Sequence, residues 1–162
     1  MGDRVLPARI AAVRAFNRFY TRHIGVLRKD YLASPFSLTQ ARVLYELAHR
    51  RQPTASDLAR DLDLDAGYLS RLLQAFEARG LIQRTRSSAD GRQQHLVLTR
   101  RGRRSFAPLD ARSQRDTAVM LRRLPPAGQA RLIAAMRTIE ALLSAERARA
   151  AVAGRPSRRS AR

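Results

Sequence analysis

The chain has 162 residues and, with 32 basic against 13 acidic side chains, a formal charge of +19. A hydrophobic content of 44% is enough for a buried core and excludes a chain that is disordered by composition. The longest uncharged stretch, residues 31–41, is too short for a transmembrane helix, and the absence of cysteine excludes disulfides, thiolate metal sites and thiol catalysis.

The positive charge is concentrated in two segments, residues 79–104 and 147–162. Such an excess favours a polyanionic partner, either nucleic acid or an anionic membrane surface. The first 15 residues carry four charged side chains and no long apolar block, so we expect no signal peptide and a cytoplasmic protein.

The first predicted element is a long helix. Apolar residues recur in steps of three and four, which places them on one stripe of a helix. They are Ile10, Val13, Phe16, Tyr20, Ile24, Leu27 and Tyr31. Pro7 lies where a first helical turn tolerates proline. We therefore assign residues 5–32 to an N-terminal helix.

A second helix is predicted after the break at residues 34–36. Ser37 and Gln40 have the spacing of a capping box, in which each side chain satisfies a backbone amide at the start of the helix. The apolar pattern then continues to about Arg50. This helix opens the segment that we assign to a single reader domain, residues 37–100.

Two further helices are joined by a tight turn. Thr54 and Asp57 form a second capping-box pair, and their helix is expected to end near Leu62. Asp65 is the expected N-cap of the next helix, and Gly80 is the expected glycine that ends it. Two short helices in this arrangement indicate a helix-turn-helix.

A β-hairpin is predicted directly after the helix-turn-helix. Residues 81–86 and 93–98 have the length and pattern of short strands, and Asp90-Gly91 between them is a strong turn signal. A hairpin in this position is a wing. The expected fold class is therefore mainly α with a small β-hairpin wing, a winged helix-turn-helix with long N- and C-terminal helices.

The remainder is predicted to be helical over residues 101–149. Thr99 is the expected cap of the first of these helices, and Pro108 is expected to kink it or to delay its regular start. The last helix carries one apolar stripe, made of Leu132, Met136, Ile139 and Leu143. Residues 150–162 have no periodicity, and we expect a disordered basic tail. The terminal helices are expected to pack on the reader domain or on a second copy of the chain.

Several stretches have residues and spacing that are typical of one protein family. They are Asp57 to Ala59, Leu69 to Leu72, Phe76 to Arg84, Asp90 to Arg92 and Leu98 to Gly102. Together they resemble the MarR family of bacterial transcription regulators, over about residues 16–143. The resemblance implies a homodimer whose terminal helices form the dimer interface. It also implies a cleft between the two regions that often binds a small, frequently phenolic or anionic, effector.

The segment from Phe106 to Asp110 further resembles members of this family that are fused to an acetyltransferase domain. This chain has no room for such a domain. It also shows no Ser-His-Asp order, no metal-ligand spacing and no glycine-rich phosphate loop. We therefore expect that the protein is not an enzyme.

The helix after Asp65 is the expected recognition helix, and its positions outside the apolar face are candidates to contact DNA. These are Ala66, Gly67, Tyr68, Ser70, Arg71 and Gln74. Arg71 is suited to a bidentate contact with guanine and Gln74 to a contact with adenine. Tyr68 and Ser70 are better suited to phosphate, and the small Ala66 and Gly67 allow close approach to base edges. The alternative for all six is an ordinary solvated helix face. Asp65 itself is expected to be structural.

The wing carries a further set of candidates. Arg92 at the hairpin tip is placed to enter a minor groove, with Asp90 to fix its direction, and the family resemblance gives both residues these roles. The alternative for Arg92 is an exposed arginine on a loop. Arg84 and Arg86 share one strand face, where they contact phosphate or one of them pairs with an acid.

Four side chains are candidates to line an effector pocket: Phe16, Tyr20, His23 and Tyr45. The alternative is that this aromatic stripe belongs to the core or to the dimer interface. The three histidines lie on separate elements, and the acidic run from Asp57 to Asp65 lacks complementary ligands, so we expect no metal and no cofactor.

These observations favour a dimeric, sequence-specific transcription regulator, a repressor that a small-molecule effector releases. Its expected partners are a second copy of the chain and double-stranded DNA that contains a pseudo-palindromic operator. No membrane partner is expected. The alternative is a basic protein of the nucleoid type that binds nucleic acid without regard to sequence.

Overall fold

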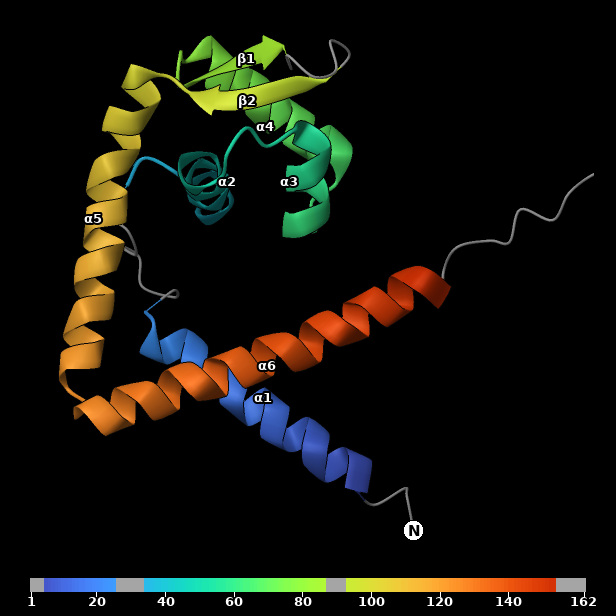
Figure 1. Ribbon diagram of the computed structural model, residues 1–162, viewed down its shortest axis with the longest axis vertical. Coiled ribbons are helices and arrows are strands. Elements are labelled where there is room, and N and C mark those ends of the chain that lie inside the picture. Colours follow the sequence, from blue (N-terminus) through green and yellow to red (C-terminus); the bar gives the residue numbers. More distant parts are fainter. Residues whose placement is uncertain (1–4, 26–33, 87–92, 154–162) are drawn as a thin grey trace, which may run out of the picture. The chain divides into compact units, whose positions relative to one another are not determined.

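The computed structural model describes residues 5–25, 34–86 and 93–153 (Figure 1). Within these ranges the chain forms six helices and two strands. They are α1 (Val5–His23), α2 (Leu38–His49), α3 (Ala55–Leu62), α4 (Ala66–Ala78), β1 (Ile82–Arg86), β2 (Gln94–Leu98), α5 (Arg100–Arg122) and α6 (Pro126–Ala153). The chain divides into two compact units, residues 1–114 and 115–162. No described helix has the length and apolar character that crossing a membrane requires.

The N-terminal helix is shorter than the predicted range of residues 5–32. α1 ends at His23, and Gly25 follows with φ 72°, in the left-handed region that glycine adopts without steric cost. The amide of Gly25 donates to the carbonyl of Arg22 at 3.1 Å, which closes the last turn. The apolar periodicity continued past this glycine and hid the helix end. Leu27 and Tyr31 lie outside the described residues.

Both predicted capping boxes are confirmed. The amide of Gln40 donates to the Ser37 hydroxyl at 3.2 Å, and the Ser37 amide donates to the Gln40 side-chain oxygen at 3.0 Å. The same reciprocal pair joins Thr54 and Asp57, at 3.2 and 3.0 Å. These bonds satisfy amides that a helix start leaves without intrahelical partners, and they set the first residues of α2 and α3.

The expected limits of α4 are also confirmed. The Asp65 carboxylate accepts from the amide of Tyr68 at 2.7 Å. At the other end Gly80 has φ 65°, and the amide of Leu81 donates to the carbonyl of Phe76 at 2.9 Å. This is a Schellman motif, in which a left-handed glycine turns the chain out of the helix. It directs the chain immediately into β1.

The two strands form the antiparallel hairpin that the sequence predicts, with Ile82 opposite Leu98 and Arg86 opposite Gln94. The turn between them, residues 87–92, lies outside the described residues. The other edge of β2 pairs with the segment before α3, where the amide of Leu96 donates to the carbonyl of Pro53 at 2.9 Å. The wing is thereby joined to the segment before α3 as well as to α4.

The core of the winged domain is apolar and draws on every one of its elements. Its fully buried side chains are Val43, Leu44, Leu58, Leu69, Leu73, Phe76, Leu96 and Leu98. Phe106 and Leu109 from α5 complete it. Each such burial stabilises the fold by roughly 1.5–3 kcal/mol. The core therefore holds α4 with its opposite face toward solvent.

α5 begins at Arg100, so the expectation that Pro108 delays its start was wrong. Thr99 makes an early start possible, because its hydroxyl oxygen accepts from the amide of Gly102 at 3.0 Å and its own amide donates to the carbonyl of Leu81 at 3.0 Å. Gly102 is buried against that same carbonyl. α5 then continues through Pro108 to Arg122.

α6 extends to Ala153, so the first residues of the expected tail are helical, and residues 154–162 lie outside the described residues. Large apolar side chains on this helix are exposed, among them Ile133, Ile139, Leu142 and Leu143. The same holds for α1, where no side chain is buried and Val13 and Phe16 are exposed. Both helices therefore carry apolar surface that the single chain leaves in water.

Candidate nucleic-acid interface

α4 separates its buried and exposed positions along the predicted line. Leu69, Leu72, Leu73 and Phe76 face the core. All six candidate DNA contacts on this helix are exposed: Ala66, Gly67, Tyr68, Ser70, Arg71 and Gln74. The structure thus gathers the predicted set on the solvent side of one helix.

Arg71 extends back over the first turn of α4. A Cβ atom added at Gly67 would lie 3.6 Å from Nη1 of Arg71. Long helical side chains lean toward the helix N-terminus, and the missing side chain of Gly67 leaves room for this guanidinium. The guanidinium, a planar cation, therefore lies at the N-terminal end of α4. The two smallest residues of the candidate set, Ala66 and Gly67, are at the same end. A base edge or a phosphate can approach the backbone there.

Asp65 is a structural cap, as the sequence predicts. Its carboxylate accepts from the amide of Tyr68 at 2.7 Å, and it lies close to Gly67, where an added Cβ would stand 3.3 Å from its Oδ1. A carboxylate at a helix N-terminus is favourable for the helix because it complements the partial positive charge there.

Arg84 has an acidic partner in the structure, whereas a contact with phosphate stays a prediction. Its Nε lies 2.8 Å from Oε1 of Glu77, and its Nη2 lies 3.3 Å from Oε2 of the same carboxylate. Arg84 therefore pairs with an acid of α4. Arg86, at the end of β1, is exposed. Asp90 and Arg92 lie outside the described residues, so their roles stay predictions.

A chain of ion pairs joins α2 to α3. Arg50, the C-cap of α2, pairs with Glu46 on its own helix and with Asp61 on α3. Glu46 is buried and also pairs with Arg42 at 2.8 Å. A buried carboxylate requires such partners, because unpaired burial of its charge is costly. The network links the C-terminal end of α2 to α3 through Arg50 and Asp61.

Two carboxylates of α3 are held in their charged forms. Hydrogen bonds from Arg60 and Arg50 lower the pKa of Asp61 below its ordinary value. The pKa of Asp57 is lowered chiefly by hydrogen bonds from the hydroxyl and the amide of Thr54. Asp57 is the capping residue that its spacing from Thr54 predicts. The bridging role of Asp61 was missed, since Arg50 lies eleven residues away in the sequence.

The four candidate effector residues fall into separate contacts. Phe16 and Tyr20 stack on α1 with their ring centroids 5.7 Å apart, and His23 stacks on Phe19 at 5.5 Å. Tyr45 stacks on His49 of α2, at 4.1 Å. Among the described residues, no contact between aromatic rings joins the α1 pair to Tyr45.

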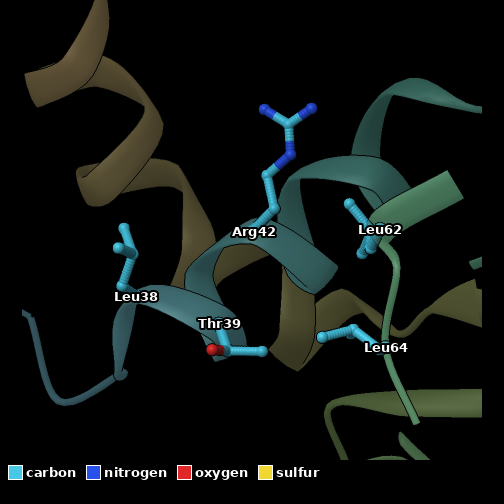
Figure 2. Close-up of a pocket in the computed structure, with 5 residues that line it drawn as sticks. All are labelled: Leu38, Thr39, Arg42, Leu62 and Leu64. Carbon is cyan, nitrogen blue, oxygen red and sulfur yellow. The ribbon is translucent and has the colours of Figure 1, made fainter. Parts of the chain in front are cut away.

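A pocket of about 210 Å³ lies elsewhere, beside the N-terminus of α2 and the α3–α4 turn. Figure 2 shows the residues that line it: Leu38, Thr39, Arg42, Leu62 and Leu64. None of them is one of the predicted effector residues. Only the fold reveals this pocket, because Leu38 and Leu64 lie in different predicted elements. In the part of the chain that the structure describes, no group of histidines and acids is arranged to hold a metal ion.

Residues 34–93 match the MarR family. The fold is similar to a MarR family protein from Bacillus stearothermophilus, with 19% identity, a TM-score of 0.67 and coverage of 89% of this chain and 99% of that one. It is also similar to AbsC, a MarR family transcriptional regulator from Streptomyces coelicolor, with 20% identity, a TM-score of 0.66 and coverage of 83% and 93%.

A third similar structure is BpsR from Bordetella bronchiseptica, whose DNA binding is regulated by 6-hydroxynicotinic acid. Its identity is 20%, its TM-score 0.60, and the match covers 78% of this chain and 91% of that one. At these identities the three likenesses establish the fold. No curated protein resembles the chain closely enough in sequence to count as a match.

Proposed function

We propose that the chain is a MarR family regulator, the family that its winged-helix segment matches over residues 34–93, and that it is a homodimer that binds a specific operator in double-stranded DNA. One observation carries the proposal. The exposed face of α4 holds six residues suited to DNA, with the Arg71 guanidinium lying over Gly67. The adjacent hairpin gives the same domain a wing beside this helix.

In this proposal α4 enters the major groove and reads bases with Arg71 and Gln74. Tyr68 and Ser70 contact phosphate, while Ala66 and Gly67 allow the backbone to come close. The wing places Arg86 on the phosphate backbone and Arg92 in the minor groove, with Asp90 orienting Arg92. The formal charge of +19 supports such a partner.

The apolar faces of α1 and α6 support the homodimer. Both helices expose large apolar side chains in the single chain, and a second copy is the partner that buries such a face symmetrically. Two copies would present two α4 helices to half-sites about one helical turn, ~34 Å, apart on the DNA. A dimer bound in this way blocks access to a promoter, so we assign a repressor role in the cytoplasm.

The effector part of the proposal rests on BpsR, whose DNA binding responds to a small aromatic acid. We propose that a phenolic or anionic effector contacts Phe16, Tyr20, His23 and Tyr45, which lie in separate ring contacts in the single chain. Their aromatic rings and imidazole offer stacking and hydrogen bonds. An effector that binds better to a dimer with a different spacing between its α4 helices would shift the population and release the operator. The protein then acts by binding, without catalysis.

A random library of duplexes provides the test. The full chain is expected to enrich an inverted repeat, and the Arg71→Ala variant is expected to enrich the same repeat with one base pair relaxed in each half-site. Enrichment of no motif by the wild type would favour the alternative, a protein of the nucleoid type that the high positive charge also supports. Enrichment of an unchanged motif by Arg71→Ala would exclude Arg71 from base recognition.

A further inference from the structure

The ion pair between Glu77 and Arg84 joins the recognition helix to the wing. Glu77 lies in the last turn of α4, and Arg84 lies in the middle of β1. The two nitrogens of Arg84 meet the two oxygens of Glu77 at 2.8 and 3.3 Å, and the side chains are 34% and 31% exposed. A two-point contact between a guanidinium and a carboxylate fixes orientation as well as distance.

The other bonds near β1 lie at the root of the hairpin. The amide of Leu81 donates to the carbonyl of Phe76, and the amide of Thr99 donates to the carbonyl of Leu81. β2 has a further partner on its outer edge, through the Leu96–Pro53 hydrogen bond, whereas among the described residues β1 pairs with β2 alone. Two-stranded ribbons twist readily. A contact three residues beyond the root therefore limits how far β1 turns relative to α4.

We propose that Glu77 and Arg84 are positioning residues that hold the wing at a set angle to the recognition helix, and that Arg84 is not a phosphate contact. The proposal rests on the DNA-binding function proposed above. A guanidinium held by a carboxylate presents little net charge to a phosphate, and the carboxylate itself repels the DNA backbone. The pair then contributes to DNA binding through geometry, because it sets the orientation of the rest of the wing relative to α4.

The substitution Glu77→Gln separates the two roles of Arg84 by the sign of its effect. The change removes one negative charge and releases Arg84. If Arg84 were a phosphate contact, both consequences would strengthen DNA binding. If the pair positions the wing, binding weakens in spite of the more favourable charge. An exposed pair of this kind contributes little to folding, so the variants are expected to fold.

The experiment measures the dissociation constant by fluorescence anisotropy for the full-length wild type, Glu77→Gln, Arg84→Gln and the double variant. Each is titrated with the enriched duplex and with a scrambled duplex, and thermal unfolding is followed by circular dichroism. Glu77→Gln and Arg84→Gln are each expected to weaken binding about threefold to tenfold, and the double variant no more than either alone. Glu146→Gln, on α6, makes the same change of charge and is the matched control; it is expected to bind as tightly as the wild type or slightly more tightly.

Two further measurements isolate the positioning role from a general loss of structure. In hydroxyl-radical footprints Glu77→Gln is expected to lose protection at the outer, wing-contacted positions and to keep it at the positions that α4 covers. Exchanging the charges, with Glu77→Arg and Arg84→Glu together, is expected to restore affinity to within about twofold of the wild type.

Equal or tighter binding by Glu77→Gln overturns the proposal, as does a footprint that shrinks evenly. The wild type tests the underlying function in the same titrations. If it binds neither duplex, the DNA-binding function fails and the positioning role fails with it. If it binds both duplexes equally, sequence-specific recognition fails alone, and the sign of the Glu77→Gln effect still decides the role of the pair.

Discussion

The guanidinium of Arg71 lies over Gly67, one helical turn earlier on α4, with Nη1 3.6 Å from the place where a Cβ of residue 67 would stand. The two residues depend on each other, because the arginine occupies space that a larger side chain at position 67 would take. Together they place the guanidinium over the first turn of α4, at the end of the helix that a major groove receives first in this kind of docking.

Gly67→Ala is expected to weaken binding to the operator about tenfold while changing the free energy of unfolding by less than about 1 kcal/mol. The added methyl group keeps DNA from the backbone, and its 3.3 Å approach to Asp65 offsets part of the helix stability that alanine adds. Anisotropy and thermal unfolding measure the two effects. Gly128→Ala on α6, where the nearest atoms lie at an ordinary 3.4 Å, is the control. Unchanged DNA binding by Gly67→Ala would remove Gly67 from the interface.

Gly102→Ala is expected to destabilise the fold by more than about 2 kcal/mol, because a Cβ at this position would lie 2.0 Å from the carbonyl oxygen of Leu81. That carbonyl belongs to backbone that cannot move without disturbing the Schellman turn after α4. Thermal unfolding of the variant, compared with Gly128→Ala, measures the effect. A melting temperature equal to that of the wild type would contradict the close approach of α5 to the hairpin root.

Acid is expected to weaken the α2–α3 ion-pair network. The pKa of Asp61 is lowered below its ordinary value of 3.8 by its hydrogen bonds with Arg60 and Arg50. A carboxyl whose pKa is lower in the folded state stabilises the fold above its unfolded pKa, and this stabilisation is lost as pH falls through the folded pKa. The difference in unfolding free energy between wild type and Asp61→Asn is therefore expected to be largest near neutral pH and to shrink below about pH 4.

Chemical denaturation of both proteins between pH 7 and pH 3 measures this difference. A difference that stays constant over the whole range would show that the Asp61 carboxylate does not contribute through its charge. Asp63 is not a suitable control, because it too has an interaction partner in the structure. Glu140→Asn, at an exposed position of α6, serves instead.

Local signals in the sequence were sufficient for most of the winged domain. The capping boxes at Ser37 and Thr54 and the glycine at position 80 each act within a few residues, so their chemistry is readable along the chain. The end of α1 could not be predicted in this way, because apolar residues keep their helical spacing beyond Gly25. A left-handed glycine overrides such a pattern without interrupting it.

Contacts between elements were harder to predict. Glu46 and Arg50 have the helical spacing of an ion pair, but the second partner of Arg50, Asp61, belongs to another helix. The ion pair of Arg84 with Glu77 depended in the same way on where β1 lies against α4. The pocket beside Leu38 required the turn after α3 to fold back onto α2. Both ion pairs and the pocket depend on how the elements pack together, and the apolar periodicity of the sequence carries no information about that packing.

Leu143→Glu is expected to dissociate the proposed dimer and to abolish operator binding, because it places a charge on apolar surface of α6 that is 64% exposed in the single chain. Sedimentation equilibrium measures the mass in solution. Ser144→Glu adds the same charge at the next position, where an apolar contact is not lost, and is the control. A monomeric wild type, or a dimer that survives Leu143→Glu unchanged, would contradict the role given to this surface.

In the proposed function, the exposed face of α4 recognises a particular DNA sequence as part of a dimer. The most direct test of this function is the affinity of the full-length protein for the enriched duplex and for a scrambled duplex of equal length, measured by anisotropy from 50 to 300 mM salt, with the stoichiometry at saturation. We expect a preference above about 10³ for the enriched duplex, with two chains bound to each duplex. Equal affinities that fall together with salt would contradict it and would leave a protein that binds DNA through charge alone.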